Sequence, residues 1–285
     1  MKYLVTGATG SFAGYAIKEL CELVGASQIV GTVRSLDKAH KLKELGIELR
    51  QADYFDLESL IEAFKGIDRV LFISSGSLER RTEQHKNVVT ALKKSGVEFV
   101  AYTSFPNAEQ SKSSLASDHR QTEHFISDAK LDHAFLRNNW YLENETSTIL
   151  GAANQQPIYY SSAEGLAGWA LKEDYAKAAA RVLAQIKGQK AVYEFGGPLI
   201  TYGDLAGLIN QVVSKPVAVN AVTDEGLREH LKTTPIPEAA IDFVIAGQDF
   251  IKEGDLAVSS EDLSAVLGRP VTPLTKGIEA LLEGK

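Results

Sequence analysis

Apolar residues follow two rhythms along the chain, one typical of buried strands and one of amphipathic helices. Short apolar, often β-branched runs recur at 2–6, 28–33, 47–50, 68–73, 99–103 and 132–136. Between them, apolar residues recur at helical spacing over 12–23, 38–45, 57–64, 79–94 and 115–129. Strands that alternate with helices in this way predict βαβ units and a parallel sheet.

The second half of the chain follows a looser pattern. Short strands are predicted at 158–160, 192–195 and 217–222, and helices at 173–187, 205–213, 225–231, 236–246 and 274–282. The chain therefore predicts an α/β fold, a Rossmann-type doubly wound parallel sheet with a smaller C-terminal α+β lobe that covers the carboxyl edge of the sheet.

A glycine-punctuated turn links the first predicted strand to the first predicted helix. It contains Gly7, Thr9, Gly10, Ser11 and Phe12. The first glycine permits a tight turn and the second permits close approach of a pyrophosphate, which the N–H groups at the start of the helix can bind. The order strand, glycine turn, helix thus predicts a dinucleotide phosphate site, with a purely structural turn as the alternative.

The second predicted strand ends at a basic residue. NAD-binding folds usually carry an acidic residue there, whereas this chain has Arg34, followed by Lys38. A guanidinium binds a 2′-phosphate through charge-assisted hydrogen bonds, so Arg34 predicts NADPH as the cofactor. A solvated basic residue in a loop is the alternative.

Two further strand ends carry candidate cofactor contacts. Asp53 follows the third strand, where it can reach an adenine or instead mark the start of the next helix, a role that Asp56 suits better. The fourth strand runs into Ser74, Ser75 and Gly76. Ligands of open α/β sheets bind at the carboxyl ends of such strands.

The helix after the fifth strand lacks the Tyr-x-x-x-Lys pair with which most short-chain dehydrogenases protonate a carbonyl. It carries His119 and Glu123 on one helical face instead. His119 is either a weak acid or, more simply, a surface or interface histidine whose hydrogen bonds are satisfied. The sequence indicates no metal site, because no Cys cluster or His-x-x-x-His spacing occurs.

Composition limits the partners. The 285 residues carry a net charge of −7, which argues against a nucleic-acid or anionic-membrane surface. No apolar run is long enough to span a bilayer. A single cysteine and a first strand that begins at residue 2, with no room for a signal peptide before it, lead us to expect a reducing, cytoplasmic setting.

The chain resembles the NmrA-like atypical short-chain dehydrogenases, in particular the type-2 NAD(P)H:quinone oxidoreductases and the related triphenylmethane dye reductases. The resemblance covers most of the chain and is strongest up to about residue 195. It rests on Thr6–Gly10, Ser27–Val30, Val33–Arg34, Gln51–Tyr54, Ile73–Ser75, Gln84–Val88, Ala101–Ser104, Leu136–Asn138, Trp140–Tyr141 and Glu143–Asn144.

The resemblance implies an NADP-binding Rossmann domain at 1–150, with returning segments near 170–198, and a substrate-binding lobe at 199–285. It implies NADPH without a flavin and a quinone-like substrate. The nicotinamide-side segment of the family maps onto 138–144, so Asn138 and Asn139 are expected at the cofactor. Trp140, Tyr141 and Asn144 are expected at the reacting groups.

Two departures from the family pattern accompany this resemblance. Ala13–Gly14 stands where relatives often have glycine first, and Asn139 stands beside the nicotinamide where relatives often have glycine. The second departure bears on the shape of the substrate pocket.

Three readings of the function follow. The first is flavin-free two-electron reduction of quinones, dyes or other electrophiles by a monomer or homodimer. The second is a non-catalytic NADP-binding redox sensor. The third, a sugar epimerase or dehydratase, is disfavoured by the missing Tyr-x-x-x-Lys pair.

Overall fold

The chain folds into two compact units. The structure is a computed structural model that describes residues 1–77, 79–185 and 189–284. Unit 1 comprises Met1–Asn138, Glu173–Tyr193 and Asp262–Arg269, and unit 2 comprises Asn139–Lys172, Glu194–Glu261 and Pro270–Lys285. These bounds differ from the predicted division at residues 150 and 199, because the segment Asn139–Lys172 packs with unit 2.

A seven-stranded sheet forms the centre of unit 1, in the order β3-β2-β1-β4-β5-β6-β9. The pairs from β3 to β6 are parallel. The strands are β1 (Tyr3–Val5), β2 (Ile29–Val33), β3 (Glu48–Gln51), β4 (Arg69–Phe72), β5 (Phe99–Ser104), β6 (Asp132–Asn138) and β9 (Val192–Phe195). The Rossmann-type parallel sheet expected from the sequence is confirmed.

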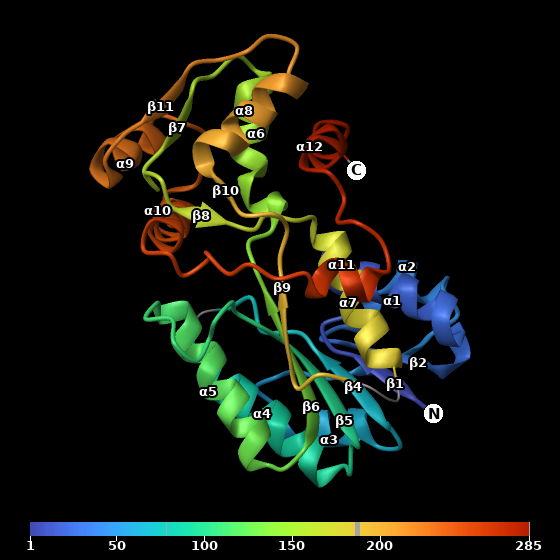
Figure 1. Ribbon diagram of the computed structural model, residues 1–285. Helices are drawn as coiled ribbons and strands as arrows, with labels where there is room; N and C mark the ends of the chain where they lie inside the picture. The colour runs from blue at the N-terminus through green and yellow to red at the C-terminus, as the bar shows by residue number, and fades with distance from the viewer. Residues whose placement is uncertain (78, 186–188, 285) are drawn as a thin grey trace. The chain divides into compact units, whose positions relative to one another are not determined.

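Helices cover both faces of this sheet (Figure 1). They are α1 (Ser11–Val24), α2 (His40–Lys43), α3 (Leu57–Phe64), α4 (Arg81–Lys94), α5 (Ser114–Asp128), α7 (Lys172–Ala184) and α11 (Asp262–Leu267). α3, α4 and α5 pack side by side on one face. α1 and α7 share the other face, where Arg181 Nε of α7 donates to Glu19 Oε1 of α1 at 2.7 Å.

The apolar core of unit 1 lies between the sheet and the helices α3, α4 and α5. Leu60, Phe64, Val88 and Leu92 belong to one buried cluster with residues of β1, β2, β4 and β5. Burial of such side chains supplies roughly 1.5–3 kcal/mol each relative to exposure. β1, β2, β4 and β5 are buried on both faces, which explains their continuous apolar runs.

The order in which the chain adds strands to the sheet reverses between β1 and β4, because β1 to β3 extend the sheet on one side and β4 to β6 on the other. β1 pairs with β2 on one side and with β4 on the other. This is the topological switch point, where open α/β sheets bind their ligands beyond the carboxyl ends of the strands. The loops after β1, β2, β4 and β5 therefore define where a ligand site in unit 1 can lie.

Unit 2 is smaller and mixes helices with short strand pairs. β7 (Ile158–Tyr160) pairs in parallel with β11 (Val219–Ala221), and β8 (Leu166–Ala167) pairs antiparallel to β10 (Ile200–Thr201). Its helices are α6 (Thr146–Ala153), α8 (Tyr202–Val212), α9 (Asp224–Lys232), α10 (Glu238–Lys252) and α12 (Leu274–Leu282). A buried cluster of Leu227, Leu231, Ile241 and Ile245 joins α9 to α10.

Several expectations about the elements need correction. The helix expected at 38–45 is only a 3₁₀ turn at Leu36–Lys38 followed by the four-residue α2. α6 was not expected, because its sequence is poor in strong helix formers and packing on α8 and α12 stabilises it instead. The helix expected at 173–187 ends at Ala184 in the structure, and residues 186–188 lie outside the described part.

Candidate functional site

The glycine turn after β1 has the geometry of a phosphate-binding loop. Gly7 has a φ of +61°, which strongly favours glycine, and its carbonyl accepts the Gly10 N–H at 2.9 Å. Gly10 precedes α1 as its N-cap without a side-chain cap. A Cβ on Gly10 would stand 3.3 Å from the Gly7 oxygen, so any side chain there crowds the turn. The helix N-terminus that follows offers N–H groups to an anion.

Residues that the sequence analysis did not single out hold the base of this loop. The Gly7 N–H donates to Thr32 Oγ1 at 3.3 Å. Thr6 Oγ1 accepts the Tyr54 hydroxyl at 2.6 Å and the Ile73 N–H at 2.9 Å. Burial raises the pKa of Tyr54, so its hydroxyl stays a donor. Threonine and tyrosine at strand ends carry no sequence signal of their own, which is why these ties were missed.

Arg34 directly follows β2 and is exposed. Its carbonyl accepts the Gln51 side-chain amide at 3.0 Å. Within the described residues its guanidinium makes no ion pair or hydrogen bond, so it remains available to an incoming anion. Asp53 turns back on its own loop, where Oδ1 accepts the Phe55 N–H at 2.9 Å, and Asp56 caps α3 as expected.

The loop after β4 is fixed through its backbone. The Ser74 N–H donates to Thr103 Oγ1 at 2.8 Å, and the Ser75 N–H donates to His85 Nε2 at 3.0 Å. Because Nε2 accepts a hydrogen bond, His85 carries its proton on Nδ1, which faces Thr122 Oγ1 at 2.8 Å. Burial and the nearby charge of Arg81 lower the pKa of His85 to about 3. His85 is therefore a neutral support for Ser75.

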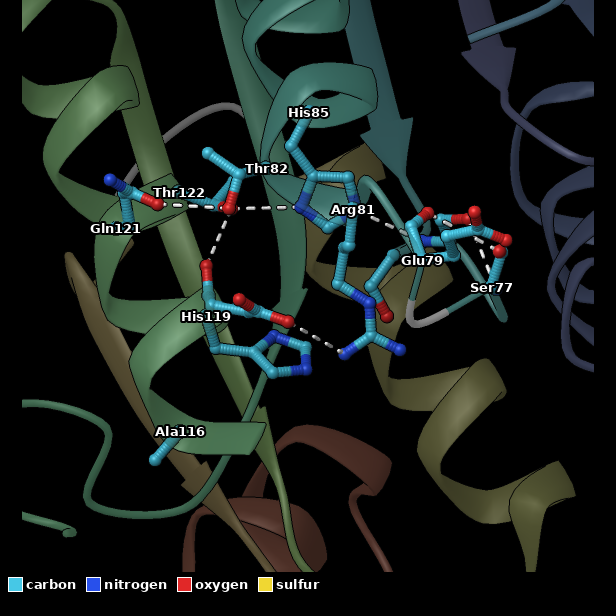
Figure 2. Close-up of polar contacts among 12 residues, drawn as sticks. Ser77, Glu79, Arg81, Thr82, His85, Ala116, His119, Gln121 and Thr122 are labelled. Atoms are coloured by element: carbon cyan, nitrogen blue, oxygen red, sulfur yellow. Dashed lines mark hydrogen bonds and ion pairs between the residues drawn. The ribbon is translucent and has the colours of Figure 1, made fainter. Parts of the chain in front are cut away.

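His119 is buried, at 6% exposure, which corrects the expectation of a surface or interface histidine. It lies on α5 beside Arg81 of α4 (Figure 2). Its Nδ1 is 2.8 Å from the Tyr102 hydroxyl. Burial, followed by the charges of Arg81 and His85, lowers its pKa well below the usual value. The ring is thus neutral at ordinary pH and cannot serve as a general acid.

Glu123, one helical turn beyond His119, is committed to an ion pair. Arg137 donates to both of its carboxylate oxygens, at 2.9 and 2.7 Å, and Ser104 donates to Oε1 at 2.6 Å. His119 and Glu123 share one helical face, as expected, and that face is buried. The position that carries Tyr and Lys in most short-chain dehydrogenases therefore holds a neutral imidazole and a fully paired carboxylate.

The side chain of Asn139 is hydrogen-bonded inside unit 2. Its Oδ1 accepts the N–H groups of Trp140 and Gly168, at 2.8 and 3.1 Å. Its Nδ2 donates to the Leu256 carbonyl at 2.9 Å, and the residue is 4% exposed. These bonds make the side chain a structural tie of unit 2, and a cofactor contact by Asn139 stays a prediction. Asn138, the last residue of β6, is also buried.

Trp140 is locked by a buried carboxylate. Its indole N–H donates to Glu145 at 3.1 Å, and Trp169 and Tyr202 donate to the same carboxylate at 3.3 and 2.6 Å. Burial raises the pKa of Glu145. Glu145 carries no signal in the sequence, because a lone glutamate at the start of a helix is usually exposed.

Asn144 lines a pocket of unit 2, together with Trp140, Glu145, Phe243, Val244, Gly247 and Gln248. Phe243 stacks on Trp140 with ring centroids 5.8 Å apart. A Cβ on Gly247 would come within 2.8 Å of the Trp140 ring, so only glycine permits this packing. Tyr141 does not line the pocket; it faces the Lys172 ammonium at 5.5 Å.

The side chain of Asn144 is available to a ligand. It makes no hydrogen bond within the described residues, and α6 has no side-chain cap. Asn144 therefore does not cap α6, the helix that follows it.

The geometry of unit 1 alone suits the binding of a phosphorylated dinucleotide. The glycine loop leaves room at the helix N-terminus that a Cβ would occupy, and Arg34 presents a free guanidinium at the end of the neighbouring strand. The residues that the structure describes contain no cluster able to hold a metal ion.

Comparison with known proteins shows the family to which the chain belongs. Residues 7–185 match the model of the NAD(P)H-binding family. Quinone oxidoreductase 2 of Escherichia coli is 35% identical over 97% of each chain. The crystal structure of NADPH-dependent quinone oxidoreductase from Escherichia coli, complexed with NADPH, superposes with a TM-score of 0.92 at 35% identity over 98% of this chain and 99% of that chain.

A second solved structure is equally similar. Triphenylmethane reductase of Citrobacter sp. superposes with a TM-score of 0.94 at 32% identity over 99% of this chain and all of that chain. The chain therefore belongs to the NAD(P)H-binding, NmrA-like reductase family.

Proposed function

We propose that the protein is an NADPH-dependent oxidoreductase that reduces quinones by direct two-electron transfer, without a flavin. The similarity to an NADPH-dependent quinone oxidoreductase across nearly the whole chain supports the proposal. So does the free guanidinium of Arg34, which suits the 2′-phosphate of NADPH.

One observation favours a quinone over an ordinary ketone. Reduction of a ketone produces an alkoxide, which needs a strong proton donor, yet His119 is neutral and Glu123 is paired with Arg137. A reduced quinone ends as a phenol-like oxygen whose pKa is about 10, by analogy with tyrosine. That oxygen needs only hydrogen-bond donors and water, because its anion is stable enough to form.

The cofactor supplies the hydride when bound, and the chain supplies binding and orientation. Gly7, Thr9, Gly10, Ser11 and Phe12 are proposed to hold the pyrophosphate and Arg34 the 2′-phosphate. Ser74, Ser75 and Gly76 are proposed to line the path of the cofactor, with Asp53 near the adenine and Asn138 near the nicotinamide.

Asn144 is proposed to orient a carbonyl group, either of the quinone or of the nicotinamide amide. Its amide is free and lines a pocket, and it offers both a donor and an acceptor without changing protonation state. Trp140, held by Glu145, is proposed to provide a flat wall for an aromatic ring, and Tyr141 to flank it.

The remaining properties stay predictions. No helix in the described part of the chain is long and apolar enough to cross a bilayer. A cytoplasmic location is supported by the single cysteine and the ordinary composition of the sequence. A monomer or homodimer is proposed, with no nucleic-acid partner, in line with the net charge of −7.

The proposal is tested by mixing the flavin-free protein anaerobically with NADPH and a simple benzoquinone. We expect catalytic loss of nicotinamide absorbance with formation of one hydroquinone per NADPH. Tight binding of NADPH without turnover of benzoquinone would instead indicate a redox sensor. Turnover of a triphenylmethane dye but not of benzoquinone would shift the substrate class toward that of the Citrobacter reductase.

A further inference from the structure

A buried arginine in unit 1 lacks the partner that its charge requires. Arg81 opens α4 and its side chain is 6% exposed. Its Nε and Nη1 atoms are buried without a hydrogen bond. The Asp118 carboxylate, 32% exposed, lies at the limit of an ion pair, at 4.0 Å from Nη1. A buried charge left in this state is unfavourable, so an additional oxygen ligand would stabilise it.

The neighbouring histidine offers a second group. Figure 2 shows the imidazole of His119 beside the guanidinium of Arg81. His119 uses Nδ1 toward Tyr102, and within the described residues its Nε2 makes no hydrogen bond. The other titratable groups around Arg81 are Asp118, His85 and Tyr102. Burial raises the pKa of Tyr102, so the nearby formal charges are the guanidinium and the Asp118 carboxylate.

The order of the strands indicates which part of a bound dinucleotide would lie near Arg81 and His119. Arg34 stands at the end of β2 and the glycine loop at the end of β1, the next strand in the sheet. Arg81 follows β4, and His119 lies on the helix after β5, the next two strands in the same direction. A cofactor with its 2′-phosphate at β2 and its pyrophosphate at β1 therefore extends its nicotinamide toward β4 and β5.

We propose that Arg81 and His119 bind the oxygen of the acceptor on which negative charge develops during reduction. The inference rests on the proposed quinone reduction and adds two catalytic residues to it. Arg81 contributes a charge-assisted hydrogen bond, and His119 donates from Nε2 while Nδ1 accepts from the Tyr102 hydroxyl. Donors aimed at a developing oxyanion stabilise the transition state more than the ground state.

The step balances without a proton donor from the chain. The quinone gains one hydride, that is one hydrogen with two electrons, from the reduced cofactor. One quinone oxygen then ends as a hydroxyl and the other as the phenolate that Arg81 and His119 hold. Water supplies the last proton as the hydroquinone leaves, since a neutral His119 that gave up its proton would become an imidazolate.

The competing reading is that Arg81 only ties α4 to α5 through Asp118. Binding of 4-nitrophenol, whose anion absorbs at a longer wavelength than the neutral phenol, separates the two readings. The phenol is titrated between pH 5 and 9 into protein saturated with NADP⁺, which cannot reduce it. Arg81→Met removes the charge at similar volume, Asp118→Asn removes only the ion pair, and His119→Phe removes the second donor.

We expect the wild-type protein to bind the phenolate at least tenfold more tightly than the neutral phenol. Arg81→Met should abolish this preference, His119→Phe should weaken it, and Asp118→Asn should keep or strengthen it. Equal preference in Arg81→Met and wild type, or no preference in wild type, would overturn the inference. Benzoquinone turnover by wild type is scored separately, so an unaltered phenolate preference in Arg81→Met would leave the proposed function standing.

Discussion

The hydrogen bonds that a side chain makes within the protein show whether its polar atoms remain available to a ligand. Arg34 and Asn144 make no side-chain hydrogen bond within the described residues, whereas Asn139 and Glu123 have their polar atoms occupied by the protein itself. From the sequence, Arg34, Asn139 and Asn144 were expected to contact a ligand, whereas Glu123 was expected only to share a helical face with His119. The structure separates them, because hydrogen-bond partners distant in sequence decide which polar atoms remain for a ligand.

Arg34→Asp should weaken the preference for NADPH over NADH. The change removes a charge-assisted hydrogen bond of about 1.5–3 kcal/mol and adds repulsion toward the 2′-phosphate. The Kd for NADPH should rise tenfold or more, since about 1.4 kcal/mol corresponds to a factor of ten, while the Kd for NADH changes little. Isothermal titration measures both constants. Lys112→Asp, the same charge change at another exposed site, is the control, and equal losses for both cofactors would contradict the assignment.

Asn144→Ala should lower kcat/KM for quinones by about ten- to a hundredfold, the scale of one or two lost oriented hydrogen bonds. The affinity for NADPH should shift much less. The melting temperature should stay close to that of wild type, because the side chain makes no bond within the described structure. Asn154→Ala, an exposed asparagine at the end of α6, is the matched control. Full turnover with early melting would show that Asn144 is structural.

At the scale of elements, the turn between β1 and α1 carries the strongest geometric requirement of the proposed site. Gly7 needs its positive φ, and Gly10 has the Gly7 oxygen 3.3 Å from the position of a Cβ. Gly14, on α1, has open space around a Cβ and an ordinary helical backbone. Gly10 and Gly14 therefore form a natural pair for a test by substitution.

Gly10→Val should abolish NADPH binding while the far-ultraviolet circular dichroism remains that of a folded protein. The branched side chain would occupy the place of the phosphates and press on the Gly7 carbonyl. Gly14→Ala should bind NADPH normally and gain roughly up to 1 kcal/mol of stability from helix propensity. Fluorescence titration with NADPH reports the outcome. Normal binding by Gly10→Val would place the site elsewhere in the chain.

The sequence predicted elements well where periodicity was strong and ends were marked. α3, β7, β9 and α12 have the predicted bounds, and Asp56 caps α3 as expected. It failed at α6, which depends on packing, and at the two-residue strands β8 and β10, too short to show alternation. The loop glycines and Arg34 carried local signals, whereas Glu145 and Arg81 gain meaning only from burial that distant segments create.

At the scale of the whole molecule, the buried histidines couple stability to pH. His85 has a folded pKa of about 3, below the 6.5 of an unperturbed histidine. Below about pH 6.5 the unfolded chain binds a proton that the native state refuses. The stability that neutral His85 contributes is therefore full above pH 6.5 and declines as the pH falls toward 3.

His85→Gln should make stability less dependent on pH between 6.5 and 4.5. Each buried neutral histidine contributes a slope of up to about 1.4 kcal/mol per pH unit, so the variant should lose about that much of the wild-type slope. Urea unfolding at several pH values measures it. His124→Gln, a change at an exposed histidine, should leave the slope nearly unaltered. An unchanged slope in His85→Gln would mean that His85 is not held neutral in the native state.

The central claim is that hydride passes directly from NADPH to a quinone without a flavin. The most direct measurement is a single-turnover reaction of the flavin-free protein with benzoquinone and NADPH that carries deuterium on one face of nicotinamide C4. The account predicts that deuterium on one face slows oxidation of the nicotinamide, with a clear primary isotope effect, and that deuterium on the other face does not. No oxidation until a flavin is added, or equal rates for both labelled forms, would contradict it.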